Sequence, residues 1–264
     1  MTPAGPCTAQ PEVLRYVTPV LAAGEEALDE YKYVGDSDFF VCAIRHLGTD
    51  PAYLMRFRNG DGRYLSNTPS RGASAGQQFT LEPPMRIPAG GRIGIELYNA
   101  SLVSVGTTIS FVGFRKFYEE ASMNRYSSPA ELGIVGDTPA GFKDEPFIYN
   151  FDVASIAALT APGQLPVKID ADADFIWRAG GFAAEDGVAT AVRLRFTDGQ
   201  GRYRMNTRIP VGSLFTQGLG DFAPIFPEIH LPASSVVYFD IENTDVGAIT
   251  NFQLAMAGVK RSPK

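Results

Sequence analysis

The chain contains the same turn twice, half its length apart. Residues 60–68 read GDGRYLSNT and residues 199–207 read GQGRYRMNT, a shift of about 139 positions from Gly62 to Gly201. Before each turn, in YLMRFR and VRLRF, apolar side chains alternate with others. Successive side chains of an extended strand point to opposite faces, so this alternation predicts strands with one buried face. We infer that one β-rich domain was duplicated within the chain.

The similarity between the two halves extends beyond the turn. IPAGGRIGIELYN in the first half corresponds to LPASSVVYFDIEN in the second, and ISFVGFRK corresponds to LAMAGVKR. Each half therefore contains seven or eight short predicted strands separated by turn residues, a pattern typical of an antiparallel sandwich. The fold class is all-β, with two tandem antiparallel β-sandwich (jelly-roll-like) domains related by internal duplication.

Two longer segments, 67–88 and 206–232, contain Pro and Gly and suit crossovers between the two sheets of a sandwich. Crossovers of this kind favour a jelly roll over a simple meander. An immunoglobulin-like sandwich is the alternative, although the Cys–Trp–Cys pattern of that fold is absent from the sequence.

Four segments follow from these patterns. We predict an N-terminal arm at 1–17, a first sandwich at 18–117, a linker at 118–147 and a second sandwich at 148–264. The arm and the linker contain proline and show little periodicity, so they cannot bury much apolar surface. Such segments either remain disordered or become ordered against a neighbouring subunit, and we expect them to supply assembly contacts.

Composition excludes several classes of function. Lys and Arg total 23 against 29 Asp and Glu, so the net charge of −6 argues against binding to nucleic acid. No run of about 18 apolar residues predicts a membrane span, and the first residues lack the features of a signal peptide. Cys7 and Cys42 are the only cysteines and are expected to be free thiols in a reducing cytoplasm.

Candidate groups for chemistry are few. His46 and His230 lack the spacing of metal ligands and do not occupy equivalent positions of the repeat. The run DADAD places Asp170, Asp172 and Asp174 on one face of an extended segment, where a Ca²⁺ site is conceivable. A solvated start of a strand is the preferred interpretation, because no closing bidentate acid follows. We predict no catalytic, cofactor-binding or metal-ligating residues and no cofactor.

Two aromatic features also need an interpretation. Arg63 and Arg202 each precede a Tyr, and we expect their guanidinium groups to lie over an aromatic ring or to bond turn carbonyls. The aromatic groups at 39–40 and 175–177 could form a platform for sugar binding, but packing toward the core explains alternate members.

The paired motifs point to a family. DSDFFVCAIR, RFRNGDGRYLSN, RIPAGGRIGIELYN and ISFVGFRKF, with the counterparts DADADFIWRAG, LRFTDGQGRYRMN, LPASSVVYFDIEN and LAMAGVKR, cover most of both domains. Together they resemble the small jelly-roll virion proteins of tailed bacteriophages, a group of capsid cement and decoration proteins and related accessory subunits.

The resemblance implies a non-enzymatic virion structural protein that stabilises the head through protein–protein contacts. Its partners would be the major capsid protein and copies of itself as a homo-oligomer, with no nucleic acid and no membrane. It would be located at the capsid surface after assembly in the host cytoplasm. The alternative function is a tail-associated protein that binds a receptor or a carbohydrate.

Overall fold

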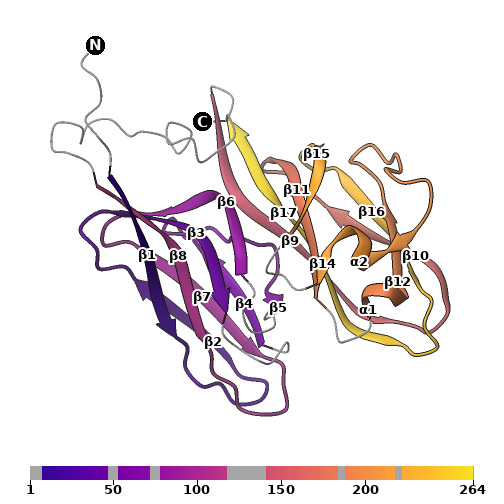
Figure 1. Ribbon diagram of the computed structural model, residues 1–264, viewed down its shortest axis with the longest axis horizontal. Coiled ribbons are helices and arrows are strands. Elements are labelled where there is room, and N and C mark those ends of the chain that lie inside the picture. The colour runs from indigo at the N-terminus through magenta and orange to yellow at the C-terminus, as the bar shows by residue number, and fades with distance from the viewer. Residues whose placement is uncertain are drawn as a thin grey trace. The chain divides into compact units, whose positions relative to one another are not determined.

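In the computed structural model, strands occupy most of the described residues, which are 8–46, 53–71, 78–117, 141–183, 188–217 and 222–263. The chain divides into two units, Met1–Ala140 and Gly141–Lys264, called here the first and the second domain (Figure 1). Within the described ranges, no helix is long and apolar enough to cross a membrane.

Two four-stranded antiparallel sheets form the first domain. One sheet has the order β1 (Thr8–Val17), β8 (Thr108–Phe117), β3 (Asp38–His46) and β6 (Gln78–Ile87). The other has the order β2 (Glu26–Lys32), β7 (Arg92–Asn99), β4 (Tyr53–Arg58) and β5 (Ser70–Arg71). Most successive strands lie in opposite sheets, which is the topology of a jelly roll.

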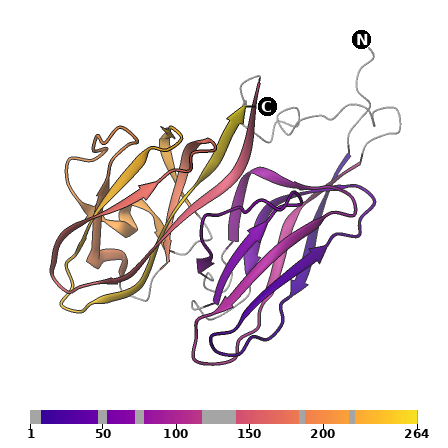
Figure 2. The ribbon, with the colours of Figure 1, turned by 180° about the vertical axis from the view of Figure 1, so that it is seen from behind.

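The second domain repeats this strand order. Its first sheet contains β9 (Phe142–Ile156), β17 (Ile249–Pro263), β11 (Asp174–Ala183) and β15 (Ala223–Leu231). Its second sheet contains β10 (Thr160–Lys168), β16 (Val236–Asn243), β12 (Val192–Phe196) and β13 (Ile209–Pro210). In the view from behind, the long strand β17 (yellow) lies beside β9 (pink) (Figure 2). The predicted jelly-roll class is confirmed, and the immunoglobulin-like alternative is wrong.

The second domain adds three short elements to the shared plan: α1 (Val188–Ala191), α2 (Val211–Leu214) and β14 (Thr216–Gln217). The two-residue strand β14 runs parallel to β11, whereas the neighbouring strand β15 is antiparallel to it. Of these elements, α2 and β14 lie within the predicted crossover 206–232, which therefore contains regular structure, whereas α1 directly precedes β12.

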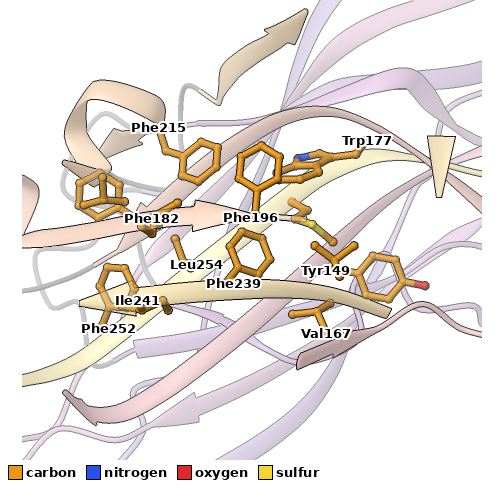
Figure 3. Packing of buried hydrophobic residues seen from close by; sticks show 14 of the residues in the cluster. Tyr149, Val167, Trp177, Phe182, Phe196, Phe215, Phe239, Ile241, Phe252 and Leu254 are labelled. Carbon is orange, nitrogen blue, oxygen red and sulfur yellow. The ribbon is translucent and has the colours of Figure 1, made fainter. Parts of the chain in front are cut away.

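Aromatic side chains fill the space between the sheets of the second domain (Figure 3). The ring centroid of Trp177 lies 4.7 Å from that of Phe196 and 5.9 Å from that of Phe239. Phe215 lies directly over Gly180, where an added Cβ would approach the Phe215 ring to 2.3 Å. A side chain at position 180 would therefore displace Phe215, whose full burial contributes about 1.5–3 kcal/mol.

The turn that appears twice has the same conformation in both domains. Gly62 and Gly201 both have φ of +78°, a left-handed conformation that favours glycine. The side-chain Oδ1 of Asn59 accepts hydrogen bonds from two backbone N–H groups of the first turn, and Oδ1 of Asp198 does the same in the second. The predicted equivalence of the two turns is confirmed.

The predicted N-terminal arm is wrong for residues 8–17. These residues form β1, which pairs with β8 along its whole length, and Leu14 is buried in the first domain. Pro11 made the segment look irregular, but an edge strand tolerates proline because its outward side needs no donor. Residues 1–7 lie outside the described part of the chain.

The predicted linker is likewise too long. Residues 142–147 begin β9, where Phe142 pairs with Pro263 near the end of the chain. The strand therefore belongs to the second domain from its first residue, because it completes the ladder with β17. Residues 118–140 lie outside the described residues.

Candidate assembly surface

A cluster of polar side chains lies on the outer face of the β2-β7-β4-β5 sheet in the first domain. The guanidinium carbon of Arg56 lies 3.4 Å from the centroid of the Tyr64 ring, and the Tyr64 hydroxyl donates a hydrogen bond to Glu96. Nε and Nη2 of Arg56 donate to the backbone oxygens of Ser66 and Asn67, at 3.0 and 2.7 Å. These contacts hold the turn against the sheet.

The second domain has the same cluster at equivalent positions. The guanidinium carbon of Arg195 lies 3.9 Å from the centroid of the Tyr203 ring. Nε of Arg195 and Nη2 of Arg208 donate to the same oxygen of Asp240, at 2.8 and 2.7 Å. Asp240 is 3% exposed, so the two guanidinium groups supply the charge that a buried carboxylate requires.

Two arginines that the sequence analysis did not single out stack on the tyrosines. Arg56 and Arg195 stack on the tyrosines, whereas Arg202 donates from Nε to Asp198 at 3.0 Å and Arg63 is exposed. Neighbouring residues in extended chain point to opposite sides, so the arginine next to a tyrosine points away from it. In the sequence, the Arg-Phe pair that precedes the turn in each half marks the two stacking arginines.

The acidic run DADAD is neutralised by a side chain of the protein. Nζ of Lys260 lies 2.7 Å from Asp170 and 3.2 Å from Asp172, and also 4.1 Å from the centroid of the Phe147 ring. The ammonium group thus occupies the position between these carboxylates at which a cation was conceivable. In the described ranges, no group of three or more His, Cys, Asp or Glu side chains is arranged to hold a metal ion.

Asp174 makes separate contacts, which also account for His230. Its carboxylate accepts a hydrogen bond from the N–H of Ala233, which lowers the pKa of Asp174, and lies 2.9 Å from Nε2 of His230. In the first domain Asp38 makes the same pair of contacts, to the N–H of Ala89 and to Nε of Arg86. His230 therefore replaces an arginine in a structural contact.

The structure describes the remaining histidine and the cysteines only in part. The backbone of His46 pairs with Ile109 at the end of β3, and its side chain lies outside the described residues. Cys42 is a half-buried free thiol whose pKa is raised by burial, and Cys7 lies outside the described residues.

The aromatic groups considered for sugar binding face away from solvent. Phe39, Phe40, Phe175 and Trp177 are each at most 2% exposed, and Nε1 of Trp177 donates to the backbone oxygen of Ala179. These four residues therefore form no platform for a carbohydrate, and their contribution is to the folded structure.

The outer faces of the two equivalent sheets differ in chemistry. The edge strand β2 of the first domain exposes Leu28 between Glu26 and Glu30. In the second domain, the face formed by β10, β16 and β12 exposes Tyr203 and Tyr238. The framework is thus shared by both domains, but the surfaces that solvent or a partner meets are not.

Comparisons with known proteins show similarity in structure only. No family model matches the chain, and no curated protein matches its sequence. Similar solved structures include the STIV MCP, with 11% identity, coverage of 95% of this chain and 96% of that chain, and a TM-score of 0.48.

PBCV-1 VP54 shows 10% identity over 97% of this chain and 94% of that chain, with a TM-score of 0.45. The major capsid protein P2 from Bacteriophage PM2 shows 12% identity over 93% of this chain and 98% of that chain, with a TM-score of 0.39. At TM-scores below 0.5, these similarities assign no function to the chain.

Proposed function

We propose that this chain is a virion structural protein that acts through protein–protein contacts and not through catalysis. The observation that carries the proposal is the duplication itself. Two jelly rolls with one strand order share their turn glycines and their arginine–tyrosine clusters, yet present different outer faces. A subunit that meets two different neighbours in a shell requires this combination, because linked domains gain affinity from several modest contacts.

The polar clusters support a structural role over a chemical one. Glu96 and Asp240 hold turns and strands in place, and Lys260 neutralises the aspartates beside it. These groups bond to the protein itself and do not converge on a shared space, as the groups of an active site would.

The finer proposal is a capsid cement or decoration subunit bound to the outside of a phage head. This position rests on the resemblance of the paired motifs to that group of proteins. A second candidate is a subunit that builds the shell itself, which the different outer faces favour because they allow copies to join head to tail. The receptor- or carbohydrate-binding alternative lost its main support when the aromatic groups proved to be buried.

One experiment tests the virion role and separates these positions. Particles from the producing host are purified, the chain is quantified by mass spectrometry, and its location is determined by electron cryo-microscopy. Many copies on the head are expected, and absence from particles or presence at the tail tip alone would contradict the proposal. Mild heat or low salt should then release a decoration subunit from an intact shell, whereas release of a shell-forming subunit should disrupt the shell.

A further inference from the structure

We propose that the outer face of the β10-β16-β12 sheet in the second domain binds the β2 edge of the first domain in a second copy of this chain. This inference deepens the proposed function by naming a partner. It rests on positions at which the duplicated domains differ in the side chains that they expose, while the contacts that hold the framework are shared.

The pairing register of the strands identifies which positions of the two domains are equivalent. Arg56 pairs with Glu96 across β4 and β7, and Arg195 pairs with Asp240 across β12 and β16. Two residues before each acid, on the same outer face, the first domain has Gly94 and the second has Tyr238. The duplication has therefore placed an exposed aromatic ring where the other copy has none.

The turns differ in the same direction. The N–H of Leu65 donates to the backbone oxygen of Phe57, and the N–H of Arg204 donates to that of Phe196, so Leu65 and Arg204 are equivalent. Leu65 is 6% exposed, whereas the side chain of Arg204 is 45% exposed. A buried apolar contact in the first domain has become an exposed cation in the second.

The face of the second domain keeps an excess of positive charge. Arg202 and Arg204 share the single carboxylate of Asp198, at 3.0 and 3.3 Å, and Arg195 and Arg208 share Asp240. Each acid is nearly buried and each pair of arginines carries one charge more than the acid neutralises. Tyr203 and Tyr238 are exposed on this face, and tyrosine and arginine are the residues most often found at the energetic centres of interfaces.

The edge of the first domain is complementary. Between Glu25 and Glu30 the chain has four acidic residues and no basic one, and Leu28 is 65% exposed among them. Glu30 also forms an ion pair with Arg92 of β7 at 2.6 Å, and its side chain remains 57% exposed there. The equivalent strand β10 has no charged residue between Thr160 and Pro166. The acidic edge therefore belongs to the first copy of the repeat alone.

The β2 edge is also accessible to a partner. Among the long edge strands in the described ranges, β2 is the one without proline. Oδ1 of Asp29 accepts a hydrogen bond from the backbone N–H of Glu30, so this donor is not available for pairing with another strand. An acidic edge around an apolar residue fits a basic face around two aromatic residues, and the two surfaces lie on one chain. Contacts between copies are then head to tail, which builds closed rings or open filaments.

The test uses the purified full chain and reverses charge on each surface. One variant is Arg202→Glu with Arg204→Glu, and the other is Glu26→Arg with Glu30→Arg. Sedimentation velocity over a range of concentrations should show association of the wild-type chain at 0.05 M NaCl and less at 0.5 M NaCl. Each variant alone should associate more weakly, on the order of tenfold or more, because like charges then face each other. An equal mixture of the two variants should recover association, because opposite charges meet again.

Two further variants keep the result interpretable. Arg63→Glu changes the equivalent turn of the first domain and should leave association unchanged. Arg202→Gln with Arg204→Gln removes charge without placing an acid beside Asp198, so it carries the test if the reversed variant fails to fold.

Three results would overturn the inference: a wild-type chain that stays monomeric, reversed variants that associate like the wild type, or a mixture that does not recover. Particles play no part in this assay. A chain that associates in this way but is absent from virions would refute the proposed function alone.

Discussion

Asn99 and Asn243 make the same contacts in the two domains. The side-chain nitrogen of each lies within hydrogen-bond distance of three backbone oxygens, those of Leu21, Ala22 and Val103 in the first domain and those of Ile156, Ala157 and Gly247 in the second. Each asparagine is at most 1% exposed. One buried amide therefore joins the two loops at the same end of each jelly roll.

Asn243→Ala should lower the free energy of unfolding by about 2–3 kcal/mol, because buried carbonyl groups lose their donor. The single tryptophan, Trp177, lies in the core of the second domain, so its fluorescence during urea denaturation reports this change. Val246→Ala, at a position of the same loop whose side chain is 83% exposed, is the control and should change stability by less than about 0.5 kcal/mol. A change for Asn243→Ala as small as the control's would contradict the assigned role.

Gly258→Ala should destabilise the second domain by about 3 kcal/mol or more. An added Cβ would lie 2.0 Å from the backbone oxygen of Ile176, so the ladder between β11 and β17 would have to move. Gly163→Ala is the matched control, because no atom lies within 4 Å of the added Cβ there. Urea denaturation followed by far-ultraviolet circular dichroism distinguishes the two, and equal stability of both variants would show that the contact is not limiting.

Asp240→Ala should cost about 3 kcal/mol, because it leaves the guanidinium groups of Arg195 and Arg208 without their shared carboxylate. The double variant Asp240→Ala with Arg195→Ala should cost less than the sum of the single changes, since the partners are coupled. Denaturation of all four proteins measures this coupling. Simple additivity would mean that the ion pair contributes nothing beyond its separate residues.

The second turn should make stability dependent on acid pH. Burial alone would raise the pKa of Asp198, but hydrogen bonds from the N–H groups of Arg202 and Gln200, and the guanidinium of Arg202, lower it below its ordinary value of 3.8. A lowered pKa in the folded state stabilises the protein above the unfolded value, and this stabilisation is lost as pH falls through the folded value.

Asp198→Asn should therefore be less stable than the wild type at pH 6, and the difference should shrink toward pH 3. Asn59 occupies the equivalent position of the first domain and accepts the same two N–H groups, so the substitution preserves the turn. Urea midpoints from Trp177 fluorescence at several pH values test this. A constant difference across the range would contradict the assignment.

Local pattern was enough to predict the duplicated all-β fold. Alternation in segments such as β4 and β12 reflects a period of two that every half-buried strand must show, and the left-handed φ of Gly62 and Gly201 reflects a turn that few other residues tolerate. These constraints act over a few residues. They therefore appear in the sequence twice when the domain does.

The sequence did not show which residues meet across the sheets. Residues 8–17 looked like an arm, because only the ladder with β8 makes them a strand. The stacking of Arg56 on Tyr64 and the contacts of Lys260 with Asp170 and Asp172 join residues that are neighbours through pairing or packing alone.

Spacing along the chain determined the two jelly rolls, their shared turns and the absence of a recognisable catalytic motif. Tertiary structure decided that the acidic run is paired with a lysine, that the suspected aromatic platform is core, and that the equivalent sheets expose different side chains. The physical reason is the distance along the chain over which each constraint acts. Backbone conformation and periodicity are local properties, whereas electrostatic pairing and burial depend on strand register and on crossovers that bring distant residues together.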